Sequence, residues 1–450
     1  MSDINSMNDT MQLEELIWNG DVLVKNGAPD DFQKKEPVKR PQASLIEKIA
    51  AIAIWPVAYV YSNFLLSFGF EGSVSFGIFV ILFMGLAEAF YFKRKRTAES
   101  WIFMALTLMS AVSACFPLGH VWKDGACAFF TQLFLAYWVL CRSDRLAEGE
   151  TSHMFLWDGI TAFFVMTFKN FHLDVRAIIL MFAGSAKGEG KKRNVGGAII
   201  GIVIGIILLC IAVARLKNAD ENFGNLLDRI TEIFAFEISF KFVAQCFLSI
   251  FFAMYFYGLL GGCYRETREH VELRSNRIKD TIATFRKVPG ITWVVLIGLF
   301  TVFYLVFFGL QGSYLFNAFS MTLPTQYTYS EYARKGFGDM CGVMVVNLIV
   351  TWLTTRTSLY GENEGIKKAV KIATACLTVE SIFFAVIAAL KLLMYIDAYG
   401  FTPLRLQSVW LVVILAYACV CILISLFTGK KTAKFWFVGS AALLAVLCLV

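Results

Sequence analysis

Long uninterrupted apolar runs recur along the chain from about residue 45 onward. Each is roughly 17 to 25 residues long, the length that an α-helix needs to cross about 30 Å of hydrocarbon. Backbone N–H and C=O groups must find partners within the segment in lipid, so such runs predict spanning helices. A β-barrel would show short alternating strands instead. The expected fold class is therefore all-α, a polytopic integral membrane helical bundle.

The composition excludes a water-soluble globular protein. The 450 residues are 58% hydrophobic and 17% charged, with a mean hydropathy of +0.63, which is too apolar for a soluble domain. The net charge of +7 sits in short loops between the apolar runs, where cations orient a membrane protein. We expect the lipid bilayer as a partner and no nucleic acid, and the oligomeric state is unknown.

About eleven crossings are predicted, plus one re-entrant or interfacial element. The predicted spans are residues 45–67, 74–92, 100–117, 125–141, 195–214, 239–262, 289–310, 337–355, 370–394, 407–427 and 434–450. Loops rich in Lys and Arg occur at 93–96, 142–145, 187–193, 264–287, 356–371 and 429–434. The loops between them are poor in cations, so the positive-inside rule predicts a cytoplasmic N-terminus.

Residues 1–44 are predicted to be a cytoplasmic, mostly disordered tail that precedes a transmembrane domain at 45–450. The tail is polar, carries Pro37 and Pro41 in a basic run, and lacks the apolar region of a cleavable signal. A short helix in LEELIWNGDVLV is the alternative.

The stretch 153–184 has basic loops on both sides, so it must enter and leave on the same face. Each half is short and carries charge, at Asp158 and Lys169 in the first and at Asp174 and Arg176 in the second. This pattern favours an interfacial or re-entrant pair over two full spans.

The segment YTYSEYARKGF, Tyr327 to Phe337, starts the predicted span 337–355 and lies on the outer side by the same count. Thr328 and Glu331 have the spacing of a capping box, which predicts a helix start. Arg334 and Lys335 are unexpected there, because cations in the first turns oppose the positive end of the helix dipole.

The segment YIDAYGFTPLR, 395–405, repeats this anomaly. Gly400 suits the end of one helix, Thr402 and Pro403 suit the N-cap and first position of the next, and Arg405 falls in the first turn. Both outer helix starts therefore carry a cation that needs compensation.

The compensating charge is either internal or a bound anion. Glu331, Asp339 and Asp397 are the internal candidates, and a carboxylate, phosphate or lipid head group at the helix N-termini is the external one. The tyrosines alternatively form an interfacial aromatic belt. The candidate binding residues of the two outer motifs are Tyr329, Glu331, Tyr332, Arg334, Lys335, Asp397, Tyr399, Thr402 and Arg405.

Glu380 lies near the middle of the span 370–394, where a carboxylate is costly and faces a partner or a water-filled cavity. Asn347 in the neighbouring span is a candidate hydrogen-bond partner for it. Glu380 and Asn347 are therefore either functional groups that face a cavity or a structural clamp between two helices, and the sequence supports both alternatives.

No catalytic or metal site is predicted. The eleven cysteines and four histidines show no ligand spacing, and no nucleophile with its base and no paired catalytic carboxylates emerge. No cofactor is expected, and an enzyme class finds no support.

The two outer motifs together resemble a large family of bacterial multi-pass membrane proteins known as a domain of unknown function, the group numbered four-one-five-three and four-one-seven-three. The resemblance covers the chain from about residue 45. It implies a bacterial plasma-membrane location and no known activity. It emphasises Glu331, Tyr332, Arg334, Gly336, Phe337, Gly400, Thr402, Leu404 and Arg405.

The leading functional hypothesis is translocation or sensing of a small anionic or amphiphilic molecule. Arg334, Lys335 and Arg405 would attract the anion, Tyr329 and Tyr399 would stack on it or hydrogen-bond it, and Glu380 would respond by protonation or ion pairing. The alternatives are a non-transporting scaffold or regulatory subunit for envelope assembly or signalling, which docks an envelope protein, and a membrane enzyme acting on lipid-linked substrates.

Overall fold

The computed structural model describes residues 43–67, 70–115, 121–183, 240–310, 328–359 and 363–449, two short strands, and isolated helical positions between 201 and 216. The chain divides into two units, Met1–Ala43 and Ser44–Val450. In the first unit, β1 (Leu16–Asn19) pairs antiparallel with β2 (Val22–Lys25). These strands lie where the sequence suggested a short helix as the alternative, and the mostly disordered tail over residues 1–44 stays a prediction.

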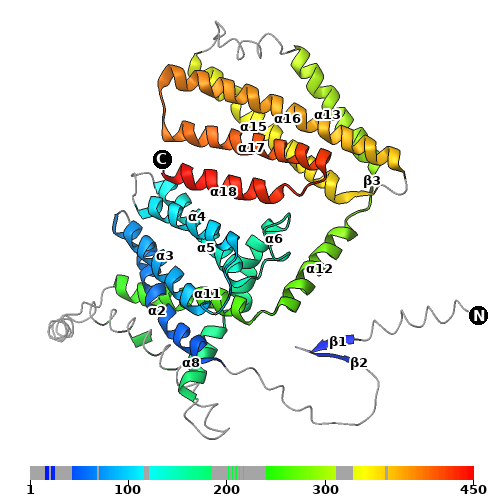
Figure 1. The fold of residues 1–450 in the computed structure, drawn as a ribbon. Coiled ribbons are helices and arrows are strands. Elements are labelled where there is room, and N and C mark those ends of the chain that lie inside the picture. Colours follow the sequence, from blue (N-terminus) through cyan, green and yellow to red (C-terminus); the bar gives the residue numbers. More distant parts are fainter. Residues whose placement is uncertain are drawn as a thin grey trace, which may run out of the picture. The chain divides into compact units, whose positions relative to one another are not determined.

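The second unit is helical (Figure 1). Its elements in chain order are α2 (Leu45–Leu66), α3 (Phe70–Phe90), α4 (Ala98–Cys115), α5 (Val121–Ser143), α6 (Phe155–Ile160), the π-helical turn η1 (Thr161–Met166), α7 (Thr167–Lys169), α8 (Leu173–Ala183), α11 (Phe240–Arg265), α12 (Arg268–Thr284), β3 (Val288–Pro289), α13 (Gly290–Leu310), α15 (Tyr329–Thr357), β4 (Ser358–Leu359), α16 (Glu364–Tyr399), α17 (Pro403–Thr428) and α18 (Ala433–Leu449).

Nine helices within these described ranges are long and apolar enough to cross a membrane, namely α2, α3, α4, α5, α11, α13, α15, α16 and α17. Each corresponds to a predicted span. The predicted span 434–450 forms α18, an apolar helix of 17 residues that is shorter than the others. The predicted span 195–214 lies outside the described residues except at isolated positions. The described helices thus give nine spans by length and composition, below the predicted count of about eleven.

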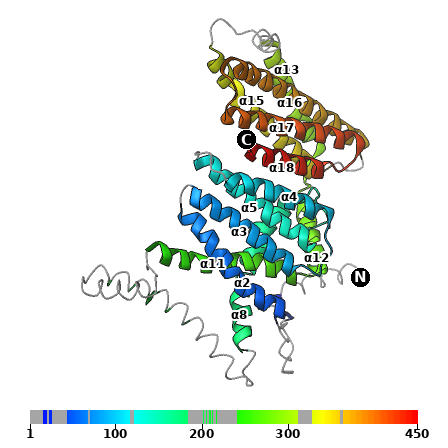
Figure 2. The same cartoon turned by 60° about the vertical axis from the view of Figure 1, so that its left-hand side comes forward.

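The helices form two groups (Figure 2), and each group packs around its own apolar core. The first joins α2, α3, α4, α5, η1, α8, α11 and α18, and the second joins α13, α15, α16 and α17. Phenylalanine and tyrosine rings fill the first core. The Tyr61 ring centroid lies 4.6 Å from that of Phe252, 4.7 Å from Phe79 and 5.1 Å from Phe256, within the range of favourable edge and offset contacts.

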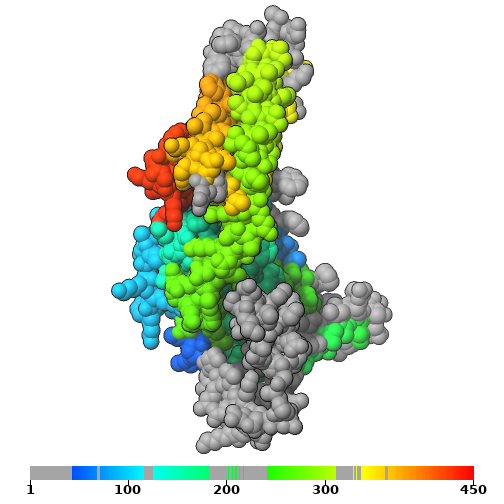
Figure 3. Space-filling model, turned by 90° about the vertical axis from the view of Figure 1, so that its right-hand side faces the viewer, coloured from blue at the N-terminus to red at the C-terminus, as the bar shows by residue number. Residues whose placement is uncertain are grey.

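The helix α18 connects the two cores. It packs against α4 of the first group and α17 of the second, as both ribbon views show (Figures 1 and 2). Its Phe437 ring stacks on Phe155 at 4.4 Å, while the Trp436 indole donates to the Ile414 carbonyl in α17 at 3.2 Å. The amphipathic helix α12 makes the other connection and continues toward α13 along one face (Figure 3).

The stretch 153–184 does not form two full-length helices. The segments α6, η1 and α7 run on to Lys169, the chain turns, and α8 begins at Leu173. The turn lies against α11, where glycines leave room for it: a Cβ on Gly258 would lie 2.5 Å from the Thr167 carbonyl oxygen, and one on Gly262 would overlap the Asn170 side chain. The short, broken form agrees with the predicted pair of short halves.

Arginine side chains close the helix ends on the side of the basic loops. Arg94 donates to the carbonyl oxygens of Ser143 and Tyr264, both at 2.7 Å, at the ends of α5 and α11. Arg142 donates to the Tyr91 carbonyl at 2.9 Å, just beyond α3. Terminal carbonyls have no partner within their own helix, so these guanidinium groups satisfy them while favouring the negative end of each helix dipole.

Ion pairs and a strand pair join further basic loops to the same layer. Lys279 of α12 lies 3.0 Å from Glu148, and Lys434 lies 2.5 Å from Glu99. β3 and β4 pair in parallel and connect the loop after α12 to the loop before α16. Five of the six basic loops therefore lie on one side of the helices, and the sixth, 187–193, is outside the described residues.

Replacing Arg142 by alanine should destabilise the fold by roughly 3 kcal/mol, because the buried guanidinium also pairs with Glu88 at 3.0 Å and its loss leaves carbonyls without donors. Arg96→Gln is the matched control, because Arg96 pairs with the same carboxylate from an exposed position. Its loss should lower the free energy of unfolding by less than about 1 kcal/mol. Thermal unfolding in neutral detergent measures both. Equal losses would contradict a special role for the buried arginine.

Candidate functional site

The first outer motif begins α15 as predicted. Thr328 Oγ1 accepts from the Glu331 amide at 3.3 Å, and the Glu331 carboxylate accepts from the Thr328 amide at 3.1 Å, so the capping box is confirmed. The backbone of Tyr329, Tyr332, Arg334 and Lys335 lies in this first part of α15, while their side chains are outside the described structure.

The second motif also forms the predicted helix boundary. Gly400, with φ of +78°, ends α16, and Thr402 and Pro403 occupy the N-cap and first position of α17. Thr402 makes no side-chain capping bond. Asp397 and Tyr399 are exposed on the last turn of α16.

Arg405 is directed back to the end of α16. Its guanidinium donates to the Gly400 carbonyl oxygen and lies 4.1 Å from the Tyr395 ring centroid and 5.7 Å from that of Tyr399. A carbonyl at a helix C-terminus and two ring faces both attract a cation. Arg405 lies at the start of α17 in sequence, where a cation is unfavourable, but its guanidinium contacts the C-terminal end of α16.

A buried lysine lies beneath the first motif. Gly336 has φ of +87°, which favours glycine, and a Cβ built on it would lie 3.6 Å from the Nζ of Lys391 in α16. The Lys391 side chain is fully buried. Lys391 is not among the site residues predicted from the sequence, although α16 places it against α15. The period of α16 alone could not reveal this contact.

Asn347 is held by neighbours other than Glu380. Its Oδ1 accepts from the Tyr304 hydroxyl at 2.8 Å, and its Nδ2 donates to Ser381 Oγ at 2.9 Å. The predicted hydrogen bond from Asn347 to Glu380 is therefore wrong. The partner is the next residue of α16, Ser381, which lies on a different face of the helix. The Asn347 amide links α13, α15 and α16.

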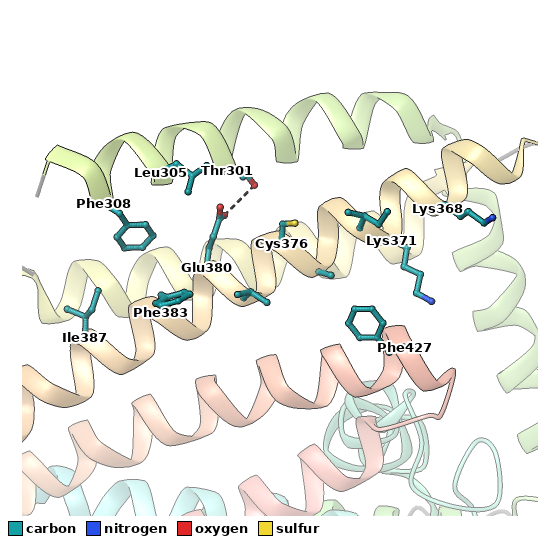
Figure 4. Close-up of a pocket in the computed structure, with 13 residues that line it drawn as sticks. Thr301, Leu305, Phe308, Lys368, Lys371, Cys376, Glu380, Phe383, Ile387 and Phe427 are labelled. Atoms are coloured by element: carbon teal, nitrogen blue, oxygen red, sulfur yellow. Dashed lines mark hydrogen bonds between the residues drawn. The ribbon is translucent and has the colours of Figure 1, made fainter. Parts of the chain in front are cut away.

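Glu380 instead faces a groove between α13 and α16 that reaches α17 (Figure 4). Its Oε2 accepts from Thr301 Oγ1 of α13 at 3.3 Å. The groove has a volume of about 1060 Å³. Apart from Glu380, Thr301 and two lysines, its lining is Leu305, Phe308, Ile372, Ala375, Cys376, Val379, Phe383, Ile387 and Phe427.

The two lysines, Lys368 and Lys371, lie at one end of the groove, in the first turns of α16. Lys371 Nζ is 5.6 Å from the Phe427 ring centroid. At 1.5 Å per residue, Lys368 is about 28 Å from Ile387 and about 18 Å from Glu380 along the helix axis. The groove therefore has a cationic end, a long apolar wall and one carboxyl group along its length.

Two buried carboxyl groups outside the predicted spans were named by the sequence but not ranked as site residues. Asp158 Oδ1 accepts from the Ala147 amide at 3.1 Å, and Asp174 Oδ2 accepts from the Trp55 indole at 3.2 Å. The second oxygen of each has no hydrogen-bond partner among the described residues. Burial raises the pKa of both carboxyl groups to about 7.

Within the described ranges, no three His, Cys, Asp or Glu side chains gather in a way that could hold a metal ion.

The features above define a multi-helix membrane protein with a lateral amphiphilic groove. The chain belongs to the family described as Domain of unknown function (DUF4153), whose model matches residues 102–450. No curated protein and no solved structure matches it significantly.

The wild-type protein should lose stability as the pH rises from 5 to 8, in part through Asp158. A carboxyl group with a raised pKa binds its proton more tightly in the folded state, so its favourable contribution is complete at low pH and lost as the pH approaches the folded value of about 7. Each pKa unit corresponds to about 1.4 kcal/mol.

Asp158→Asn should therefore flatten the fall of the melting temperature between pH 5 and 8. Asp144→Asn is the control, because Asp144 is an exposed carboxylate nearby with a left-handed backbone that asparagine tolerates. An unchanged pH slope in Asp158→Asn, or an equal flattening in the control, would count against a buried neutral carboxyl group.

Proposed function

We propose that this protein binds an anionic amphiphile in the groove between α13 and α16, and that this binding serves transport or sensing in a bacterial cytoplasmic membrane. The observation that carries the proposal is the order of groups along the groove, with Lys368 and Lys371 at one end, apolar side chains beyond them and Glu380 part of the way along. The volume of about 1060 Å³ is at the upper end of ligand sites in proteins.

The order of groups suits a molecule with an acidic head and an apolar tail. Both lysines are exposed and lie on the first turns of α16, at the end that belongs to the basic-loop side. Lysine near a membrane surface attracts anionic head groups by about 1 kcal/mol per side chain. Beyond the lysines, the apolar lining on α16 runs from Ile372 to Ile387, about 22 Å along the helix. This length is about three quarters of the roughly 30 Å hydrocarbon core.

Glu380 gives the groove a second polar contact. A carboxyl group at this depth is costly unless it meets a partner, and Thr301 supplies one hydrogen bond at 3.3 Å. A polar group on the bound molecule would supply another. In a transporter, proton exchange at Glu380 would accompany release. In a sensor, occupancy would change the packing of α13 on α16.

The outer motifs have a secondary role in this proposal. Arg405 is engaged by the end of α16, so it would orient the loop, while Arg334 and Lys335 would supply the attraction for an anion on the outer side. The basic loops would face the cytoplasm, together with the N-terminus.

A non-transporting scaffold is the second candidate, and Asn347 favours it. Its side chain is 1% exposed and bonded to both Tyr304 and Ser381, as expected of a clamp between helices and not of a group that lines a passage. In that function the groove would hold a structural lipid, and the outer motifs would be the docking surface.

Replacing Lys368 or Lys371 by glutamine should each weaken binding of phosphatidylglycerol by about five-fold, the equivalent of about 1 kcal/mol per cation. Lys367→Gln is the matched control: Lys367 lies on the same turn, pairs with Glu364 at 3.2 Å and does not line the groove. Native mass spectrometry in neutral detergent, with phosphatidylcholine as the comparison lipid, measures the dissociation constants.

Val379→Trp tests the apolar part of the same site without changing charge. Val379 is 43% exposed toward the groove, so tryptophan fills the groove and should displace the tail while the lysines remain. Retained affinity in Val379→Trp, or equal losses in Lys367→Gln and Lys368→Gln, would show that the lipid does not occupy the groove.

A further inference from the structure

A small cationic pocket lies on the basic-loop side of the first helix group, away from the groove. It is formed where the connection from α3 to α4 meets the end of α5, and it has a volume of about 280 Å³. Its lining is Arg94, Lys95, Thr97, Ser143, Asp144 and Arg145. Three cations and one carboxylate therefore face a space too small for a whole lipid but adequate for a head group.

Backbone carbonyls fix the two arginines of this pocket in place. Arg94 donates to the carbonyls of Ser143, Tyr264 and Cys263 at 2.7, 2.7 and 3.3 Å. Arg145 donates through Nε to the same Cys263 carbonyl at 3.3 Å. Lysine and arginine side chains in cytoplasmic loops are usually flexible. Arg94 and Arg145 are each held in one geometry, which lowers the entropy cost of binding an anion.

The pocket's cations make no ion pair among the described residues, and Glu266 and Asp144 act on Arg145 only from a greater distance. Neither Arg94 nor Lys95 nor Arg145 has a carboxylate oxygen within the 4.0 Å of an ion pair among the described residues. The only carboxylate in the lining, Asp144, lies 4.0 Å from Arg268 outside the pocket and is 54% exposed. Burial, and after it the charge of Arg94, lower the pKa of the Arg145 guanidinium, as like charges held together would.

We propose that the pocket between Arg94, Lys95 and Arg145 binds a phosphate group at the cytoplasmic surface of the membrane. The hydroxyl of Thr97 lies in the same lining, so a phosphate would meet cations and a hydroxyl, the usual set for this group. Basic pockets between membrane helices on this side bind lipid head groups. A lipid phosphodiester and free inorganic phosphate share this chemistry.

The exposed aromatic side chain beside the pocket bears on the source of the phosphate. Phe92, in the turn that carries Arg94 and Lys95, is 82% exposed. Aromatic side chains at this level contact the membrane interface, so a head group still attached to its lipid would have an apolar contact next to the pocket.

The test uses the full chain in neutral detergent, in a Lys368→Gln/Lys371→Gln background that weakens binding in the groove. Titration calorimetry with inorganic phosphate and native mass spectrometry with phosphatidylglycerol measure the two sources separately. Lys95→Gln is the primary variant, because Lys95 makes no hydrogen bond that supports the fold within the described ranges. Arg145→Gln is the second variant, and Lys93→Gln, two residues from Lys95 and outside the lining, is the matched control.

We expect Lys95→Gln to weaken binding about five-fold and Arg145→Gln about ten-fold or more, with Lys93→Gln within about two-fold of the background protein. If the variants lose affinity for phosphatidylglycerol alone, the ligand is a lipid head group. If they lose affinity for inorganic phosphate, the ligand is the free anion. Equal losses in Lys93→Gln and Lys95→Gln, or no binding of either probe, would overturn the phosphate site.

Discussion

The carbonyl groups left over at helix C-termini are the constraint on which this structure depends. A spanning helix satisfies the hydrogen bonds of its own interior, but its last four carbonyls need donors at the boundary between lipid and water. Here guanidinium groups from neighbouring loops supply them. Arg94 reaches the ends of α5 and α11, Arg142 reaches the end of α3, and Arg405 reaches the end of α16. Arg94 and Arg142 thereby fix the relative positions of helices that are distant in sequence, so these two residues of the basic loops also make tertiary contacts.

The sequence predicted what local chemistry determines. Nine spans, the capping box at Thr328 and Glu331, and the boundary at Gly400 and Pro403 all follow from apolar length or from residues a few positions apart. Prediction from the sequence failed where a side chain's partner lies on another helix. Arg405 looks misplaced at the start of α17, because its partners are on α16, and Asn347 bonds Ser381 and not Glu380. Only the packing of α13 on α16 could reveal the groove.

The two candidate sites differ in what they could exchange with the membrane. The groove joins Lys368 and Lys371 to an apolar wall and to Glu380, so it can accommodate a molecule along the length of a helix. The pocket at Arg94, Lys95 and Arg145 is about 280 Å³ and polar, so it suits a head group alone. Each site lies within a different helix group, and α12 and α18 connect those groups. The helix α18 has residues in the first core and packs against α17 of the second group.

The return of α18 to the first helix group has a consequence for biosynthesis. Ala441, Ala445 and Cys448 are buried in the core made by α2 to α5 and α11, yet α18 is translated after every other described helix. Chains are threaded into the membrane from the N-terminus onward, so the first core stays incomplete while α13, α15, α16 and α17 are inserted. During that interval the face of α4 that later receives α18 is exposed to its surroundings, so the first core reaches its final packing only when the last described helix is in place.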